Sequence, residues 1–186
     1  MVEPRDTIKI VNVVASTGIG QEIDLKQVTH GLEGADYDPK RFPGVVYRTK
    51  DPKTAALLFR SGKIVCTGAK SIDEAHEGIE NVFQSLRNIG IDVKGTPEIT
   101  VQNIVASADL HSALNLNAIA NGLGLENIEY EPEQFPGLVY RVSDPKVVIL
   151  LFGSGKLVIT GGKKPEDMVS AVDRIVTELK SLSFLR

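Results

Sequence analysis

The sequence has no tryptophan, a single cysteine and only 5% aromatic residues in a chain of 186. One cysteine excludes an intramolecular disulfide and is typical of a reducing compartment. Cys66 stands between Val65 and Thr67 in an apolar stretch, which predicts a small buried side chain. The chain also lacks an apolar run of membrane-spanning length and an apolar stretch at its start. We therefore expect neither a membrane helix nor a signal peptide.

The motifs of catalysis and metal binding are missing as well. His30, His76 and His111 fall at no metal-ligand spacing and have no cysteine or acidic cluster beside them. Gly62-Lys63 and Gly155-Lys156 lack the earlier glycine and the following serine or threonine of a phosphate-binding loop. Neither a nucleophile elbow nor a dinucleotide fingerprint occurs. We predict a protein that is not an enzyme and needs no cofactor or metal.

What the sequence does contain is a duplication. Residues 37–71 and 130–164 lie 93 positions apart and are identical at 21 of 35 positions, and Asn12–Ser16 matches Asn103–Ser107 at an offset of 91. Two copies predict a molecule with pseudo-two-fold symmetry, because a solenoid would need three or more repeats. We expect the first repeat at 1–93 and the second at 94–186.

Each repeat has the same order of predicted elements. A β-branched strand precedes a short helix, four or so short strands between turn signals, and a long amphipathic helix. Spacings of two to five residues between the short strands predict antiparallel hairpins, and hence an α+β fold with helices on one face of an antiparallel sheet. The expected strands are 7–15, 45–49, 54–59, 63–67, 98–106, 138–142, 147–152 and 156–160, and the expected helices are 25–32, 71–86, 114–123 and 165–179.

The strand alternation predicts a second sheet face with little charge. In 63–67, Ile64 and Cys66 point to one face while Val65 and Thr67 point to the other. The first face is purely apolar and suits the space under the helices. The second mixes valine, threonine and asparagine, whereas a solvated face usually carries more charge. It is therefore a candidate contact surface.

Four of the six phenylalanines are matched between the repeats. Phe42 and Phe135 precede Pro-Gly turns, and Phe59 and Phe152 precede the Ser-Gly turns. They could be duplicated core residues or exposed wedges, and their place beside turns favours wedges. Matched basic residues also flank the weakly polar face, where either solvent or phosphate groups could be their partners.

The charge distribution differs between the repeats. The net charge of the chain is −3, and residues 8–93 carry 11 basic and 11 acidic residues, whereas residues 99–182 carry 7 and 10. A shared scaffold with unequal charge indicates a symmetric body that makes an asymmetric interaction.

The repeated Phe-Pro-Gly-x-Val-Tyr-Arg and Leu-Leu-Phe-x-Ser-Gly-Lys-x-Val-x-Thr-Gly motifs, with the paired Asn-[Val/Ile]-Val-Ala-Ser strands, resemble the TATA-box-binding protein family over essentially the whole chain. The resemblance implies a saddle, formed by a curved ten-stranded antiparallel sheet with four helices on its convex face. The resemblance further implies that the concave face of the saddle binds in the minor groove of a TATA-box promoter element. This family is itself the standard example of kinking DNA, by about 80°, so the angle belongs to the family and is not inferred from these residues.

The resemblance also implies partners and a location. They are double-stranded DNA, transcription factor B and, through it, RNA polymerase in the pre-initiation complex. We expect a monomer on DNA and either a monomer or a homodimer when free. The pI of about 5.7 and the lack of a long low-complexity segment before the core resemble archaeal members. An archaeal member would be cytoplasmic and nucleoid-associated, and a eukaryotic one nuclear.

The family roles carry over residue by residue. Four phenylalanines would intercalate (Phe42, Phe59, Phe135, Phe152), and eight residues would contact bases in the minor groove (Asn12, Val14, Val65, Thr67, Asn103, Val105, Val158, Thr160). Six would hold phosphates (Arg48, Ser61, Lys63, Arg141, Ser154, Lys156), and the acidic second loop would receive transcription factor B (Glu129, Glu131, Glu133). The chain departs from the family at Val11, where glutamine is usual, as at Gln102. An alternative hypothesis is a small-ligand-binding protein or enzyme that uses the curved sheet as a pocket wall.

Overall fold

The computed structural model describes residues 2–124 and 126–186, which form two compact units. The first unit is Asn12–Gln102, and the second unit is Met1–Val11 together with Asn103–Arg186. The opening segment joins the second unit through an ion pair between Arg5 and Asp173 and a 2.8 Å hydrogen bond from Asp109 N to Thr7 Oγ1. The repeat boundary between residues 93 and 94 remains a prediction, because compact units are defined by spatial contact.

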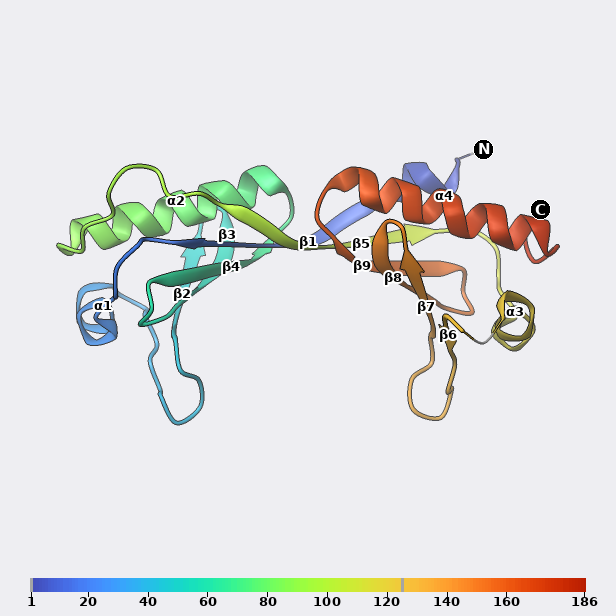
Figure 1. Ribbon diagram of the computed structural model, residues 1–186, viewed down its shortest axis with the longest axis horizontal. Coiled ribbons are helices and arrows are strands. Elements are labelled where there is room, and N and C mark those ends of the chain that lie inside the picture. The colour runs from blue at the N-terminus through green and yellow to red at the C-terminus, as the bar shows by residue number, and fades with distance from the viewer. Residues whose placement is uncertain (1, 125) are drawn as a thin grey trace. The chain divides into compact units, whose positions relative to one another are not determined.

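The two halves of the chain share the order strand, short helix, three strands and long helix, with η1 added before the first half and β6 added within the second (Figure 1). The first half of the chain forms η1 (Pro4–Thr7), β1 (Lys9–Gly18), α1 (Leu25–Gly31), β2 (Val45–Lys50), β3 (Lys53–Leu58), β4 (Lys63–Ala69) and α2 (Ile72–Asn88). The second half forms β5 (Thr100–Asp109), α3 (Leu116–Leu123), β6 (Ile128–Glu129), β7 (Leu138–Ser143), β8 (Lys146–Leu151), β9 (Lys156–Gly162) and α4 (Pro165–Ser181). The predicted strands and helices are present, and the α+β class is confirmed.

The strands pair antiparallel throughout, in the order β2-β3-β4-β1 in the first unit and β5-β9-β8-β7-β6 in the second. The described residues form nine strands where ten were expected. The counterpart of β6 is a single bridge between Asp36 and Val46, with backbone hydrogen bonds of 2.9 and 2.8 Å. Its ladder stops because Gly34, at the position of Asn127, has a φ of +84° that turns the backbone out of the extended region. In the second unit Asn127 O instead accepts from Arg141 N and the ladder continues.

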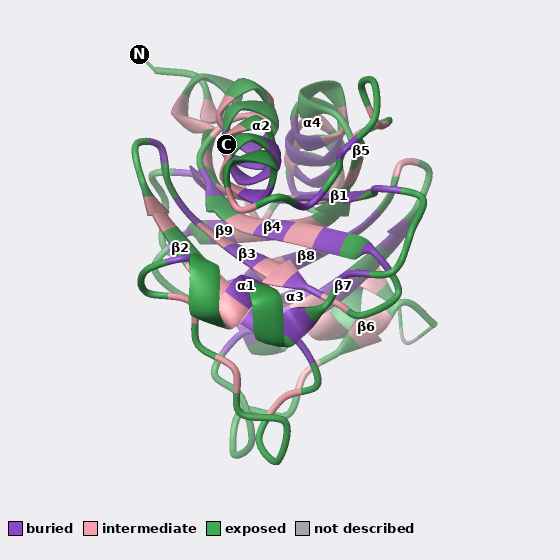
Figure 2. Ribbon diagram, turned by 90° about the vertical axis from the view of Figure 1, so that its left-hand side faces the viewer, coloured by how far each residue is buried: buried purple, intermediate pink, exposed green. Residues whose placement is uncertain are grey.

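Each long helix packs its apolar stripe on one face of its own unit's sheet. The fully buried positions of α2 include Ile79, Val82 and Phe83, and those of α4 include Met168, Val172 and Ile175. Buried segments of both helices appear in purple in Figure 2. Cys66 is fully buried beneath α2, as predicted, and burial raises the pKa of its thiol.

The short helices begin where side chains cap them. Asp24 Oδ1 accepts from Lys26 N and Gln27 N at 3.0 and 3.3 Å, which fixes the start of α1 at Leu25. Asn115 Oδ1 accepts from Ala118 N at 3.1 Å, so α3 starts two residues later than expected. The helix α1 contacts β2, and α3 contacts β6.

Candidate nucleic-acid interface

In each unit the sheet face opposite the long helix is almost free of charge, and its side chains are half-buried except for the buried Ser16. One row crosses four strands of the first unit at Ser16, Val65, Leu57 and Val46, and the matching row of the second unit holds Ser107, Val158, Leu150 and Val139. Sequence reasoning found the valines of β4 and β9 but missed Leu57 and Leu150. The apolar-polar alternation of β3 and β8 could have identified both leucines. This face, which we call the open face, is an apolar surface without helices over it.

Asparagine and threonine pairs interrupt the open face in both units. Asn12 Oδ1 accepts from Gly68 N at 2.7 Å, and its Nδ2 donates to Thr67 Oγ1 at 3.3 Å. In the second unit, Asn103 Oδ1 accepts from Gly161 N at 2.7 Å and Nδ2 donates to Thr160 Oγ1 at 3.2 Å. Because the backbone N–H requires an oxygen, each amide is held with its nitrogen toward the threonine. The second proton of that nitrogen is left to donate to a ligand.

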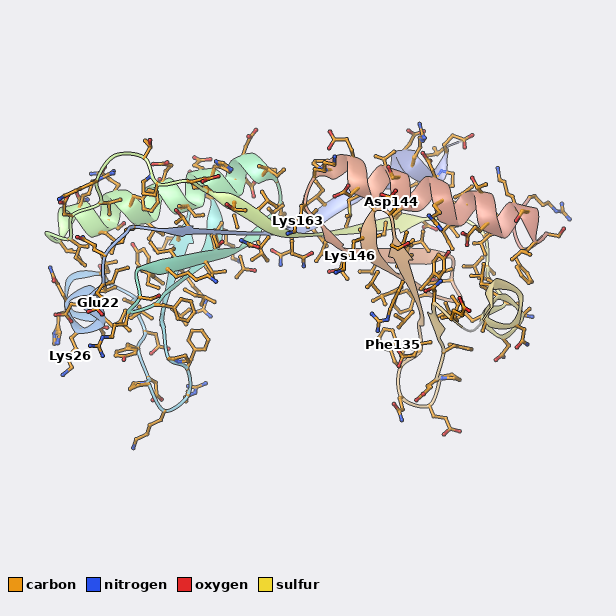
Figure 3. The ribbon with its side chains drawn as sticks, in the orientation of Figure 1. Glu22, Lys26, Phe135, Asp144, Lys146 and Lys163 are labelled. Carbon is orange, nitrogen blue, oxygen red and sulfur yellow. The ribbon has the colours of Figure 1, made fainter. Side chains whose placement is uncertain are left out.

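The four predicted wedge residues form two pairs. Phe42 and Phe59 lie with ring centroids 5.7 Å apart, and Phe135 and Phe152 with centroids 5.9 Å apart. They are not core residues, since Phe135 is 40% exposed and the other three are half-buried. Phe135 lies on the loop between β6 and β7 (Figure 3). Aromatic pairs at this separation are mutually stabilising.

A glycine beside each pair makes room for the rings. A Cβ on Gly44 would come within 2.9 Å of Phe42 Cε2, and one on Gly137 within 2.7 Å of Phe135 Cε2. The Pro-Gly sequence that both repeats share therefore has a steric reason. Any larger residue at these positions must displace a phenylalanine ring.

The Ser-Gly-Lys turns hold their serines next to the lysine backbone. Lys63 N donates to Ser61 Oγ, and Lys156 N donates to Ser154 Oγ, both at 3.4 Å. In the second unit a cleft of about 460 Å³ brings Phe152, Ser154, Lys156 and Val158 together. The predicted wedge Phe152, the predicted base contact Val158 and the predicted phosphate contacts Ser154 and Lys156 thus line one cleft.

Two lysines of each repeat were missed by sequence reasoning. In the first unit, Arg48, Lys53 and Lys70 line a cleft of about 560 Å³ beside Thr67. Their counterparts in the second unit, Lys146 and Lys163, are labelled in Figure 3. Lys53 and Lys70 match these lysines at the offset of 93, so the repeat itself carried the signal. Cations beside an uncharged face are suited to phosphate groups that flank an apolar groove.

Of the three carboxylates at the acidic loop of the second unit, Glu129, at the end of β6, forms an ion pair. Arg141 Nη2 lies 3.4 Å from Glu129 Oε2, and both side chains are 61% exposed. An ion pair this exposed contributes about 0–1 kcal/mol. In the described part of the chain, the exposed Glu131 and Glu133 form no ion pair within 4 Å. In the first unit the corresponding loop presents the exposed cations Lys40 and Arg41.

The position where Val11 replaces the usual glutamine differs between the two units in its hydrogen bonding. Gln102 Nε2 donates to Ser16 Oγ at 2.8 Å on the first unit's open face. The matching position of the second unit is Val11, which is 41% exposed and offers no donor. The two open faces therefore differ by one amide.

The alternative of a ligand-binding protein or enzyme would gain support from Phe42 and Phe135 buried beneath the helices and a closed cavity over the sheet. Phe135 is instead exposed on a loop, and the clefts beside the open faces are open to solvent. Within residues 2–124 and 126–186, His, Cys, Asp and Glu form no group that could hold a metal ion. None of the helices described is long and apolar enough to cross a membrane.

Comparison with known proteins gives one consistent result. The family model described as "Transcription factor TFIID (or TATA-binding protein, TBP)" matches residues 7–89 and 98–182. The chain is 69% identical to TATA-box-binding protein E of Halobacterium salinarum, over 100% of both chains. It is 70% identical to TATA-box-binding protein 1 of Haloferax volcanii, over 100% of this chain and 98% of the other. The solved structure of Methanococcus jannaschii TBP is 56% identical, with a TM-score of 0.84 over 94% of this chain and 98% of that one.

Proposed function

This chain belongs to the TATA-binding protein family, and from that premise we propose that it is a transcription initiation factor that binds a TATA-box element through the DNA minor groove. The observation that carries the proposal is the open face of each unit, apolar in its rows and bordered by cations. Close approach of such a face selects A·T pairs, because a G·C pair adds an amino group that would be buried against valine and leucine without a hydrogen bond.

The asparagine and threonine pairs provide the polar part of this recognition. A·T pairs present only acceptors, adenine N3 and thymine O2, in the minor groove. The remaining proton of Asn12 Nδ2 or Asn103 Nδ2 can donate to such an acceptor. Val14 and Val105, two residues further along the same strands, supply apolar contact on either side.

The phenylalanine pairs supply the bend. Inserting Phe42 with Phe59, or Phe135 with Phe152, into a base step requires unstacking, which costs a few kcal/mol and least at TA steps. A bend then lets the open face bury more surface, and this offsets the cost. The paired rings suit insertion because they are already in contact in the free protein.

The phosphate contacts fix the position of the protein on the duplex without reading sequence. We assign them to Arg48, Ser61, Lys63, Arg141, Ser154 and Lys156, and add the missed lysines Lys53, Lys70, Lys146 and Lys163. Their location explains how a protein with a net charge of −3 can bind DNA, since local charge outweighs the total.

The unequal loops supply direction. We propose that the exposed carboxylates of Glu131 and Glu133, with Glu129, bind a basic surface of transcription factor B, which brings in RNA polymerase. The first loop carries Lys40 and Arg41 in the same place and would repel such a surface. Transcription factor B would therefore bind only one end of a nearly symmetric protein–DNA complex.

The test compares a TATA-containing duplex with a G·C-substituted duplex by fluorescence anisotropy, with a donor and an acceptor dye at the duplex ends to report bending. We expect the protein to bind the TATA duplex more tightly than the G·C-substituted duplex, and to bend only the TATA duplex. Equal affinity for both duplexes would overturn minor-groove recognition. Changing Phe135 and Phe152 together to Ala should reduce both signals, and unchanged bending would remove the wedge role.

Partner binding is tested separately. Glu131→Lys and Glu133→Lys together should leave the TATA affinity within about twofold and abolish the supershift caused by transcription factor B. A persistent supershift would contradict the assignment of the loop. The matched control changes Lys40 and Arg41 to Glu in the first loop.

A further inference from the structure

The turn between β3 and β4 carries an arginine that the matching turn between β8 and β9 lacks. Arg60 lies between the proposed wedge Phe59 and the proposed phosphate contact Ser61, and its side chain is exposed. At the offset of 93, Gly153 follows the wedge Phe152. The first repeat therefore places a cation directly after a residue that is proposed to enter the DNA, and the second repeat places a glycine there.

The two turns share one backbone structure. Ile23 N donates to Arg60 O, and Leu114 N donates to Gly153 O, both at 2.9 Å. Apart from its chain neighbours, a Cβ on Gly153 would meet only Leu114 O, at 3.8 Å, so the second turn has room for a side chain. The two units thus differ here by the arginine side chain and not by the backbone that holds it.

A lysine of α1 lines the same cleft as Arg60. The cleft has a volume of about 480 Å³, and Lys26 and the half-buried Tyr37 form part of its wall. Lys26 is labelled beside α1 in Figure 3. Within residues 2–124 and 126–186, neither Lys26 nor Arg60 forms an ion pair within 4 Å. At the offset of 91 the second repeat has the uncharged Asn117 in place of Lys26, so both cations belong to the first unit alone.

Two carboxylates share the cleft with these cations. Asp24 Oδ1 accepts from Lys26 N and Gln27 N at 3.0 and 3.3 Å, so backbone amides offset part of its charge. Glu22 is exposed and also lines the cleft. Two cations therefore attract an anion to this cleft against one exposed carboxylate that caps no helix.

The DNA that the wedges enter supplies such an anion. Phe42 and Phe59 are proposed to open one base step. Duplex DNA carries one negative charge for about every 1.7 Å of its axis, so phosphate groups continue directly outside that step. An arginine that directly follows the wedge is suited to these phosphates, because its planar fork can donate to two phosphate oxygens at once.

We propose that Arg60 and Lys26 bind the phosphate backbone of the duplex just outside the base step that Phe42 and Phe59 enter. This inference rests on the proposed function and extends the site beyond the TATA element itself. The second unit makes no matching contact, because glycine and asparagine stand in these two places. The first unit therefore holds a longer stretch of DNA than the second, and the protein–DNA complex has a direction before transcription factor B binds.

The test measures the slope of log K against log salt on two duplexes by fluorescence anisotropy. One duplex ends at the TATA element, and the other continues by about ten base pairs on each side. Each phosphate contact contributes about 0.9 to the magnitude of this slope. Arg60→Gln should therefore lower the magnitude by about 1 on the longer duplex and leave it unchanged on the shorter one.

The reciprocal variant and a matched control complete the experiment. Gly153→Arg gives the second turn the side chain of the first, so it should raise the magnitude of the slope by about 1 on the longer duplex only. Lys94→Gln removes one positive charge from a side chain that is 85% exposed beside Asp92, and should change neither slope. All three variants alter exposed positions, so their melting temperatures should stay within about 3 °C of the wild type.

Three results would overturn the proposal. An equal effect of Arg60→Gln on both duplexes would place the arginine on phosphates inside the element, and no effect on either would leave it in solvent. An unchanged slope in Gly153→Arg would refute the argument that only the side chain separates the two turns. The DNA-binding proposal fails separately, if the wild type does not prefer the TATA duplex to the G·C-substituted duplex.

Discussion

The rings of Phe135 and Phe152 meet nearly edge to face, with centroids 5.9 Å apart and an angle of 67° between the planes. They come from a loop and from the end of β8, and only the antiparallel pairing of β7 with β8 brings them together. The geometry depends on the absence of a side chain at Gly137.

Gly137→Ala should therefore reduce DNA bending. The new Cβ would lie 2.7 Å from Phe135 Cε2 and 3.0 Å from Phe152 Cε1, so the ring pair must move. We expect a loss of TATA affinity of about tenfold, or about 1.4 kcal/mol, measured by anisotropy together with the bending signal. Gly153→Ala is the control, because its nearest neighbour would be Leu114 O at 3.8 Å. Equal effects of the two changes would refute the steric argument.

Asn103→Asp isolates the donor on the open face. Aspartate keeps the oxygen that accepts from Gly161 N, so the fold should be retained, but it removes the amide protons and places a negative charge in the groove. We expect at least a tenfold loss of TATA affinity, with the melting temperature changed by less than about 3 °C. Asn12→Asp should behave alike. Unchanged affinity in both variants would exclude base contact by the asparagines.

The salt dependence of binding tests the missed lysines. Each phosphate contact contributes about 0.9 to the slope of log K against log salt on duplex DNA. Changing Lys53 and Lys70 together to Gln should lower that slope by about 2. Lys94→Gln is the control, because Lys94 is 85% exposed in the segment after α2 and lies next to Asp92. A slope that stays constant would place Lys53 and Lys70 away from phosphates.

Ser183 is a stability site away from the open face. Its φ of +64° is a left-handed conformation, which the first repeat assigns to Gly90 with a φ of +87°. Ser183→Gly should raise the free energy of unfolding by about 0.5–1 kcal/mol and the melting temperature by about 1–4 °C. Gly90→Ser should have the opposite sign in the same calorimetric measurement. A destabilised Ser183→Gly would show that the serine makes a compensating contact.

Tyr140 gives the stability of the protein a dependence on high pH. Burial, and then the hydrogen bonds to Glu178 at 2.8 and 2.9 Å, raise the pKa of this phenol above its usual value. Because the folded state holds the proton longer, this contribution is complete below pH of about 10 and is lost as pH rises through the folded-state pKa. The stability advantage of the wild type over Tyr140→Phe, from chemical unfolding, should shrink above pH of about 10. A difference independent of pH would contradict this.

The sequence by itself determined the duplication, the alternation in β4 and β9, and the phenylalanines beside the turns. Strand alternation and turn chemistry are local features, since they depend on neighbouring residues. The repeat is found by aligning the sequence with itself. They were enough to predict the α+β fold and the family, both of which the comparisons confirm. The proposed roles of the individual site residues are still predictions.

Only the tertiary structure decided which side chains become partners. Lys70 joins Arg48 and Lys53 at one cleft because β2, β3 and the end of β4 pair in that register. The same kind of pairing places Glu129 beside Arg141, while one left-handed glycine, Gly34, reduces the tenth strand to a bridge. Such contacts join residues far apart in the chain, and no local pattern encodes their register.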